Sequence, residues 1–480
     1  MVILHTNDVQ GRQAASSEAI GHDRIAALFA EMRRTTPATF LFDAGDAAQG
    51  TALVKWNKGE AAIDIMNAAG YDGMVLGNSD FDYGWDNALA LADKAEFPIF
   101  TQSFVLRNAP GLQTAALFER GGRRLGVFGL TTPETVQASY GGFGRNFGTT
   151  EELFAYADAN VQALRKAGAE VVVALTHLGK DDLGFLTSYQ LRDNVQGIDV
   201  IIDGHNYSNT PLLDIVQVEG KALIVAAAEH AQSLGVVEFY SINGRLTPRA
   251  RSIAREDAAT ASPAPSVTTV IDRWISESRA RGARVVTRSP VRLNADRISL
   301  RSRETELGNL TTDAMRAATG ADVALLNGGS IRDSLPQGDV TNAAIEGILP
   351  YDTTVIKAEV PGSILREALE LGVSHYPNEA GGFLQASGIS FSFDPAQPAG
   401  KRLLQVAVGG QPLNDARVYT VATGDWIASG GDDFVMLKAP FKTPLDGKTW
   451  TLIDILAEYL NQNGNKPIPG IEGRITIIGN

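Results

Sequence analysis

Five side chains with metal-binding chemistry each follow a short apolar run in the first half of the sequence. The runs resemble strands, and the residues at their ends are Asp8, Asp46, Asn78, His177 and His205. Carboxylate and amide oxygens together with imidazole nitrogens bind hard and borderline divalent cations when rigid elements hold them. One aspartate after a strand is more often a turn or helix-cap residue, and one histidine is more often a core residue. Five in one repeated pattern favour a divalent-metal site.

The elements that must position these side chains alternate between strands and helices. Between the apolar runs lie amphipathic stretches such as residues 25–32, where Ile25, Leu28, Phe29 and Met32 have the spacing of one helical face. Residues 153–164 repeat this spacing. Strands that alternate with helices predict a layered α/β domain with ligands beyond the strand ends.

The chain is too long for one ordinary core, because it has 480 residues. An Ala-, Ser- and Pro-rich stretch near residues 258–267 is typical of a linker, and a helix-like segment follows it. Farther on, SGISFSFD alternates apolar residues with serines, and QVAVGGQPL predicts a hairpin. We therefore expect a first domain at 1–257, a linker with an interdomain helix at 258–288, and an α+β domain at 289–480.

Composition excludes several classes of protein. The hydrophobic fraction of 44% and the charged fraction of 20% are those of a globular protein, and no apolar run is long enough to cross a bilayer. The net charge of −13 argues against a nucleic-acid polymer as partner. The chain has no cysteine, which excludes disulfides, thiolate metal sites and a cysteine nucleophile.

The start of the sequence favours a cytoplasmic protein. Strand-like sequence begins at Val2, with no basic and apolar leader in front of it. A mature form whose signal segment had been removed would begin in the same way and would be periplasmic or secreted. The sequence leaves the oligomeric state open.

Nine motifs resemble, in order, those of the 5′-nucleotidase family of the bacterial periplasm and animal cell surfaces. The motifs are LHTNDVQG, FDAGDAAQGT, LGNSDFDYG, ALTHLG and IDGHNYS, followed by RETELGNLTTDAM, LLNGGSIRD, GGFLQASG and GGDDF. The resemblance implies α/β and α+β architecture: a four-layer calcineurin-like metallophosphoesterase sandwich, followed by a C-terminal 5′-nucleotidase domain that binds the substrate.

The resemblance also implies roles for the five strand-end residues. Asp8 matches a ligand of the first metal, and Asp46 matches the carboxylate that bridges the two ions. The remaining ligands of the second metal match Asn78, His177 and His205. The implied cofactors are divalent ions (Mn, Zn, Mg, Co or Ca), and the second site is the better preserved.

Three positions depart from the family pattern. Gln10 stands where the family's Asp-x-His has histidine, and Tyr207 stands at the last position of its Gly-His-x-His or Gly-His-x-Gln. Both are weaker ligands than imidazole for zinc or manganese, although an amide oxygen suits magnesium or calcium. His5 and His230 are near these segments and either could compensate, but we expect each to support a strand of the same sheet.

The third departure concerns catalysis. The matching catalytic set is Asn78, Ser79 and Asp82, in which Ser79 replaces the family's catalytic histidine and Asp82 matches the carboxylate that orients it. A serine hydroxyl donates one neutral hydrogen bond, and loss of one preorganised donor costs about 10²–10³ in turnover. We expect a slow or specialised phosphohydrolase that acts on nucleoside monophosphates or related esters. The alternative is a catalytically impaired nucleotide-binding protein or sensor.

The second half of the chain carries the matching nucleotide-binding residues. Arg332 matches the arginine that contacts the anionic end of the nucleotide. Phe383 and Trp426 match two aromatic rings that sandwich the base, and Asp432 matches the carboxylate that binds the ribose hydroxyls. Aromatic residues are more often core residues, but glycine pairs beside these motifs favour exposed loops. The expected partner is a nucleotide or nucleoside.

Overall fold

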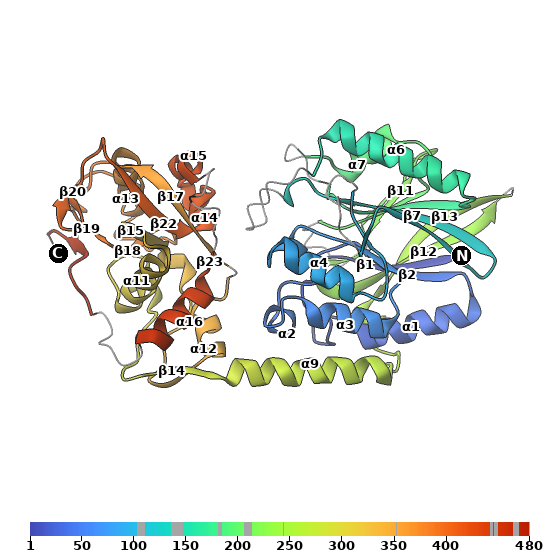
Figure 1. Cartoon of the computed structure of the whole chain (residues 1–480), viewed down its shortest axis with the longest axis horizontal. Coiled ribbons are helices and arrows are strands. Elements are labelled where there is room, and N and C mark those ends of the chain that lie inside the picture. Colours follow the sequence, from blue (N-terminus) through green and yellow to red (C-terminus); the bar gives the residue numbers. More distant parts are fainter. Residues whose placement is uncertain are drawn as a thin grey trace. The chain divides into compact units, whose positions relative to one another are not determined.

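The computed structural model describes residues 1–102, 111–135, 147–180, 185–205, 214–242, 244–351, 353–441, 445, 450–463 and 470–479. The chain forms two compact units, Met1–Ser278 and Arg279–Asn480 (Figure 1). The division falls inside helix α9 (Pro265–Ala283). The three-part division at residues 257 and 288 remains a sequence-based prediction.

The first unit contains a seven-stranded and a six-stranded sheet. The first sheet has the order β13 (Arg245–Ala254), β12 (Ser233–Ile242), β1 (Val2–Thr6), β2 (Thr39–Asp43), β3 (Gly73–Val75), β4 (Ile99–Phe100), β5 (Leu112–Gln113). The second has the order β10 (Asp214–Val216), β11 (Leu223–Ala226), β9 (Val200–Asp203), β8 (Val171–His177), β7 (Arg123–Thr131), β6 (Ala115–Arg120). Strands β1 to β4 pair in parallel, as do β7, β8, β9 and β11. The carboxyl ends of parallel strands therefore gather at one edge of each sheet.

Helices cover the outer faces of both sheets. Figure 1 shows α6 (Thr150–Lys166) and α7 (Ser188–Asn194) on one side, and α1 (His22–Thr35) and α3 (Glu60–Ala69) on the other. Between the sheets lies a buried cluster that includes Phe40, Phe42, Phe100, Val127 and Val173. This order of helix, sheet, sheet and helix confirms the predicted four-layer sandwich.

The helix α6 shows why its sequence forms this element. A capping box joins Thr149 and Glu152 at its start, and Arg165 and Lys166 lie in its last turn. Its buried face includes the predicted apolar positions of residues 153–164. Local sequence signals therefore fix both the ends and the inward face of this helix.

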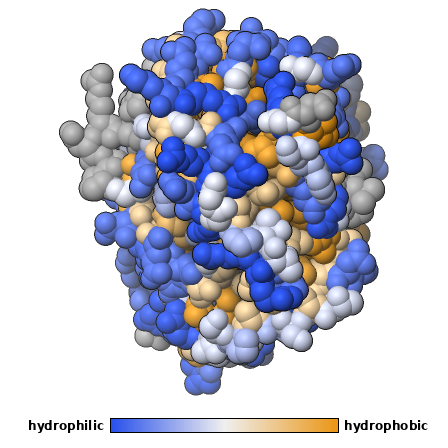
Figure 2. Space-filling view, turned by 90° about the vertical axis from the view of Figure 1, so that its right-hand side faces the viewer, coloured by the Kyte–Doolittle hydropathy of each residue, from blue (hydrophilic) through white to orange (hydrophobic). Residues whose placement is uncertain are grey.

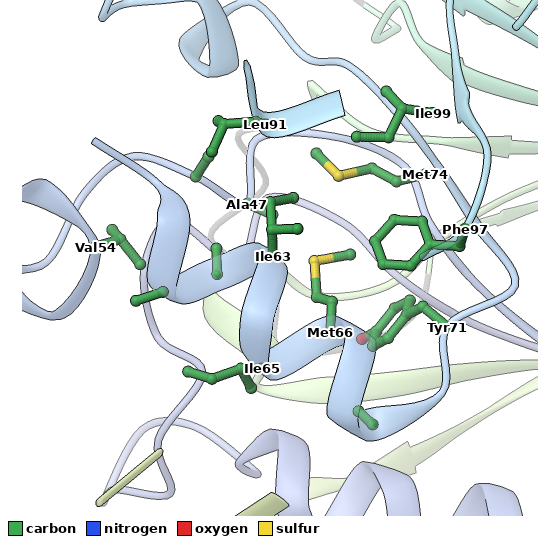
Figure 3. Close-up of a cluster of buried hydrophobic side chains, with 14 of the residues drawn as sticks. Ala47, Val54, Ile63, Ile65, Met66, Tyr71, Met74, Leu91, Phe97 and Ile99 are labelled. Carbon is green, nitrogen blue, oxygen red and sulfur yellow. The ribbon is translucent and has the colours of Figure 1, made fainter. Parts of the chain in front are cut away.

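A second core lies beneath the outer helices of the first sheet. Figure 3 shows Ile63 and Met66 of α3 packed with Met74 and Phe97. Ala47, fully buried, belongs to the same cluster and directly follows Asp46 in the chain. The loop that carries this carboxylate is therefore fixed to the core on one side.

The first part of α9 packs on the first unit. Val267, Ile271 and Trp274 belong to that unit's core. Arg273 forms an ion pair of 2.7 Å with Asp64, to which the indole of Trp274 also donates a hydrogen bond of 3.2 Å. These contacts explain why the first unit extends to Ser278.

The second unit mixes parallel and antiparallel pairing. A five-stranded sheet has the order β18 (Leu384–Ser387), β15 (Val323–Asn327), β22 (Val418–Gly424), β17 (Thr354–Pro361), β23 (Trp450–Thr451). A four-stranded sheet has the order β21 (Gln411–Pro412), β20 (Leu403–Val408), β19 (Ile389–Phe393), β24 (Ile475–Ile477), and β14 (Val285–Ser289) pairs with β16 (Gly338–Thr341). Their helices include α11 (Glu306–Thr319), α13 (Gly362–Gly372) and α16 (Leu452–Asn463). The predicted α+β class is confirmed.

Two local predictions in this unit are also confirmed. In β19 the apolar residues are buried and the serines between them are half-buried. Gly409 and Gly410, both with positive φ, connect β20 and β21. The alternation in β19 and the glycine pair between β20 and β21 thus predicted these two elements correctly.

The surface is mostly polar on the face shown in Figure 2, where hydrophilic side chains surround smaller hydrophobic areas. None of the helices in the described part of the chain has the length and apolar character needed to cross a membrane.

Candidate metal centre

Asp8, Asp46 and His177 converge from three strand ends of the first unit. Each offers a ligand atom, and these atoms all lie within 4.8 Å of one another. Nε2 of His177 is 3.5 Å from Oδ1 of Asp46 and 3.9 Å from Oδ1 of Asp8. All three side chains are at most 1% exposed. Two buried carboxylates that face one imidazole nitrogen form a suitable ligand set for a divalent cation.

The orientation of His177 suits metal binding. Its Nδ1 lies 2.7 Å from the carbonyl oxygen of Ala44, so Nδ1–H donates and Nε2 faces the carboxylates. Burial lowers the pKa of His177, but attraction to Asp46 and Asp8 raises it more, to about 10. The pocket thus stabilises a positive charge at Nε2, where a divalent cation would replace the proton. The residues present fit such an ion.

Two loops carry the carboxylates, and the main chain holds them together. Asp8 and Asp46 have left-handed backbone conformations with φ of 48° and 60°. The N–H of Asp8 donates to the carbonyl of Gly45, and the N–H of Gln10 donates to that of Asp46, both at 2.9 Å. A side-chain carbon at Gly77 would lie 2.0 Å from Oδ1 of Asp46, so only glycine fits there. Such strained backbone at several positions is typical of functional sites.

Asp80 fixes the loop that carries Asp46. Its buried carboxylate accepts four main-chain hydrogen bonds, of 2.8 to 3.1 Å, from residues 46, 47, 48 and 77. Burial and repulsion from Asp46 raise the pKa of Asp80 to about 6. Sequence reasoning missed this role. The available signal was an acidic residue in the motif NSDFD directly after a strand.

Ser79 contacts the expected bridging carboxylate. Its N–H donates to Oδ1 of Asp46 at 2.9 Å, and its hydroxyl donates to Oδ2 at 2.8 Å. The side-chain amide of Asn78 lies 3.4 Å from the same hydroxyl, and Asn78 is 8% exposed. Asp82 follows the short 3-10 helix η1 (Ser79–Phe81) and is half-buried. Ser79 and Asn78 therefore lie beside Asp46, and the catalytic roles of Asn78, Ser79 and Asp82 remain predictions.

His205 lies next to the cluster and pairs with a residue that sequence reasoning missed. Its main-chain N–H lies 3.2 and 3.1 Å from the two oxygens of Asp8, and its ring centroid is 5.1 Å from that of His177. Its Nε2 is 2.8 Å from Oε2 of Glu134, and this hydrogen bond lowers the pKa of Glu134. A carboxylate bonded to one imidazole nitrogen orients the other toward a metal.

The two remaining histidines near the site behave differently. His5 is fully buried in β1 against Gly235 of β12, and burial lowers its pKa to about 3, as suits a strand-supporting residue. His230 belongs to η2 (Glu229–Ala231), and its Nε2 lies 3.1 Å from Oε1 of Gln10. We expected His230 to support a strand, but its side chain contacts Gln10, in the loop that follows Asp8, instead. Tyr207 lies outside the described residues.

Three glycine-containing loops meet in the second unit. The N–H groups of Gly328 and Gly329 donate to the carbonyls of Phe383 and Gly381, at 2.7 and 2.9 Å. The amide of Asn327 donates to Asp432 at 3.1 Å. The loops that carry the predicted nucleotide-binding residues therefore lie side by side, and Asn327 is a contact that sequence reasoning missed.

The predicted side chains in this unit differ in exposure. Trp426 is 58% exposed, and Arg332 is exposed with its guanidinium 5.2 Å from the centroid of Tyr351. Phe383 is only 2% exposed and belongs to the core, so the exposure expected from its glycine pair is not observed. Burial and the nearby charges of Arg297 and Arg332 lower the pKa of Arg301. This part of the second unit thus presents the exposed rings of Trp426 and Tyr351 and three arginines, of which Arg297 forms an ion pair with Glu379.

Comparison with known proteins identifies both units. The family model for calcineurin-like phosphoesterase matches residues 1–208, and that for the 5′-nucleotidase C-terminal domain matches residues 285–439. The chain is 28% identical to human 5′-nucleotidase, covering 99% of this chain and 90% of that protein. It is 29% identical to the trifunctional nucleotide phosphoesterase YfkN of Bacillus subtilis, covering 99% of this chain but only 35% of the relative.

One solved structure matches this chain over its whole length. The crystal structure of a 5′-nucleotidase precursor from Thermus thermophilus matches with a TM-score of 0.60 and 28% identity. The match covers 100% of this chain and 99% of that one. The predicted resemblance and fold class are therefore confirmed.

Proposed function

Since the chain belongs to the 5′-nucleotidase family, with a calcineurin-like phosphoesterase domain and a 5′-nucleotidase C-terminal domain, we propose that it releases phosphate from nucleoside monophosphates or related esters. Its relatives include a nucleotide phosphoesterase and several 5′-nucleotidases, and the first unit matches the calcineurin-like phosphoesterase model. The observation that carries the proposal is the buried cluster of Asp8, Asp46 and His177. A divalent ion held by these three side chains would supply Lewis-acid chemistry, which polarises a phosphoryl group and lowers the pKa of a bound water.

The residues of this chain have distinct parts in the proposed reaction. His177 and the two carboxylates would hold an ion, and Glu134 orients the imidazole of His205 beside them. Asp80 keeps the loop of Asp46 in place before the substrate arrives. Such preorganisation lowers the reorganisation that the transition state requires.

Ser79 supports the finer proposal of a slow or specialised enzyme. Its hydroxyl donates to Asp46 and is neutral, so it offers the transferring phosphoryl group no cation. Gln10 is in turn bonded to His230 and is a weaker ligand than imidazole for zinc or manganese. Both features predict lower turnover than a site with histidine at positions 10 and 79.

The second unit is proposed to bind the nucleoside. The exposed ring of Trp426 offers a stacking surface for a base, and Asp432 offers acceptors for ribose hydroxyls. The guanidinium of Arg332 offers donors to an anionic group. These assignments explain why polar and aromatic groups share three adjoining loops.

A metal-by-substrate screen tests the proposal. Purified protein receives Mn²⁺, Zn²⁺, Co²⁺, Mg²⁺ or Ca²⁺ in turn, and phosphate release is measured from AMP, other nucleoside monophosphates and a simple phosphomonoester. We expect slow release that depends on the added ion and on an intact Asp46. Absence of turnover with every ion and substrate, together with full activity of Ser79→His, would overturn it.

A second candidate function is nucleotide binding without useful turnover. The engagement of Ser79 with Asp46, in place of a histidine, favours it. Calorimetry with adenosine and AMP in the presence of a chelator measures the nucleoside site alone. Tight binding by a protein that hydrolyses nothing would establish this alternative.

A further inference from the structure

Gln10 and His230 place two metal-binding atoms side by side at the edge of the metal loops. Oε1 of Gln10 lies 3.1 Å from Nε2 of His230, although the residues are 220 positions apart in the chain. Both side chains are half-buried. Position 10 has glutamine where the family pattern has histidine. The imidazole of His230, from another loop, lies at the end of this glutamine side chain.

The spacing of the two atoms suits a shared ion. Two ligands at about 2.0–2.2 Å from one cation, with an angle of about 90–110° between them, lie roughly 2.8–3.6 Å apart. The contact of 3.1 Å falls in this interval. Hydrogen bonding explains the contact in the structure as it stands, but the same spacing allows an ion to take the place of the proton.

The main chain ties this pair to the two carboxylates. The N–H of His230 donates to the carbonyl of Asp8 at 2.8 Å, and the N–H of Gln10 donates to the carbonyl of Asp46 at 2.9 Å. Gln10 and His230 have left-handed conformations, with φ of 46° and 61°. Non-glycine residues adopt such conformations at a cost, which the surrounding structure must offset. The main chains of Gln10 and His230 are therefore bonded directly to those of Asp46 and Asp8, in conformations that the surrounding structure must support.

The pair is distinct from the cluster already described. Among the described residues, the ligand atoms of Asp8, Asp46 and His177 all lie within 4.8 Å of one another, and His230 does not belong to this group. The pair therefore lies outside the first ligand set, and an ion would have to draw it toward the shared carboxylates. An amide oxygen, an imidazole and two carboxylates match the preferences of Mn²⁺, Zn²⁺ or Co²⁺.

We propose that Gln10 Oε1 and His230 Nε2 bind a divalent cation together with the carboxylates of Asp8 and Asp46, in addition to the ion held at His177. In this site, the imidazole of η2 supplies the nitrogen ligand that the Asp8 loop lacks. The proposal rests on the metal-dependent function above and concerns how many ions the centre holds and which side chains hold them.

Manganese binding to the whole chain tests the proposal without any measurement of activity. Calorimetry and the electron paramagnetic resonance spectrum of Mn²⁺ give the number of ions and show whether two of them are coupled. We expect two ions per chain with a coupled spectrum in the unchanged protein. His230→Ala is expected to bind one ion with an uncoupled spectrum, because only the site of Asp8, Asp46 and His177 remains.

Two further variants separate ligand loss from damage to the fold. His375→Ala removes an exposed histidine of the second unit and should retain both ions. Gln10→His combined with His230→Ala returns an imidazole to the Asp8 loop and should regain the second ion. Circular dichroism of each variant confirms that it is folded.

The outcomes are decisive in either direction. One ion in the unchanged protein, or two in His230→Ala, would overturn the proposal, as would failure of the folded double variant to regain the second ion. Such a result leaves the proposed function intact if the one-ion protein still releases phosphate from AMP. The experiment therefore distinguishes failure of the cation site at Gln10 and His230 from failure of the proposed phosphohydrolase function.

Discussion

The loops of the first unit that carry Asp8 and Asp46 (the metal loops) hold their side chains more firmly than the loops of the second unit that carry Trp426 and Asp432 (the nucleotide loops). Asp46 is fully buried and accepts two hydrogen bonds from Ser79, and its loop is held by Asp80. Trp426 is 58% exposed and packs one part of its ring against Gly431. The metal site is preorganised, whereas the nucleotide-binding surface leaves a key side chain exposed.

The physical reason lies in what each region binds. Ligands of a small ion must converge within tenths of an ångström, and disordered carboxylates would repel one another. A nucleoside offers a large flat surface, so an exposed ring can bind it with little preorganisation. We therefore expect substitutions near the ion to change stability and ion affinity together, whereas substitutions in the nucleotide loops change substrate affinity alone.

The largest effect is expected from Asp80→Asn. The amide keeps one acceptor oxygen, but its NH₂ group faces main-chain N–H donors, which should cost about 3 kcal/mol of unfolding free energy. Manganese affinity should fall by about 10–100-fold, because the loop of Asp46 loses its support. Denaturant unfolding and calorimetry measure the two effects. Unchanged ion affinity in a folded variant would show that the loop needs no such support.

Acid should destabilise the first unit through its buried histidines. Burial lowers the pKa of His22 to about 3, and its Nε2 lies 3.2 Å from the hydroxyl of Tyr71. In the unfolded chain this imidazole binds a proton below pH of about 6.5, so its stabilising effect is complete above that pH and declines toward pH 3. The loss at pH 5 should be about 2 kcal/mol.

His22→Gln isolates this contribution, because glutamine does not titrate. Thermal unfolding at pH 7 and pH 5 should show a smaller acid-induced loss of stability in the variant than in the unchanged protein. The second unit contains one histidine, His375, which is exposed, and removing it should leave the loss unchanged. Equal acid sensitivity in His22→Gln and the unchanged protein would contradict the effect of burial.

Ser79→Ala should weaken manganese binding about 10-fold, since a hydrogen bond to a charged group contributes about 1.5 kcal/mol. Ser79→Thr keeps the hydroxyl and should retain most of the affinity. The difference between these variants, measured by calorimetry, tests the bond to Oδ2 of Asp46. Equal affinities would mean that the main-chain N–H alone positions the carboxylate.

Trp426→Ala is expected to change substrate binding alone. Loss of base stacking should raise KM for AMP about 10-fold, because base stacking on an aromatic ring contributes about 1–3 kcal/mol. The turnover number and manganese affinity should stay unchanged, since the ring is not part of the metal loops. Initial-rate kinetics with AMP check this, and Trp426→Phe serves as the matched control. A fall in kcat with constant KM would contradict a role in binding.

Much of the metal centre could be predicted because its ligands follow strands. An apolar run that ends on Asp46 or His177 is a local signal, and parallel strands bring such ends to one edge of a sheet. The sequence therefore gives the order of the ligands and the class of the fold. It also shows that positions 10 and 79 depart from the family pattern.

Contacts between distant segments could not be predicted in this way. Glu134 meets His205 across 71 positions, and His230 meets Gln10 across 220, in each case through loops whose course depends on the packing of both sheets. Phe383 follows a glycine pair yet lies in the core, because burial depends on what packs over a residue and not on its neighbours in the chain.

The alternation of elements, the identity of the strand-end ligands and the family can be recognised from the amino-acid sequence, since these depend on local periodicity and on motifs. The side chains that support those ligands become visible in the folded chain alone: Asp80 bonds to the loop of Asp46, Ser79 bonds to the oxygens of Asp46, and His230 contacts Gln10. The reason is that hydrogen bonds and burial are properties of residues that are close in space, and three-dimensional packing alone brings these residues together.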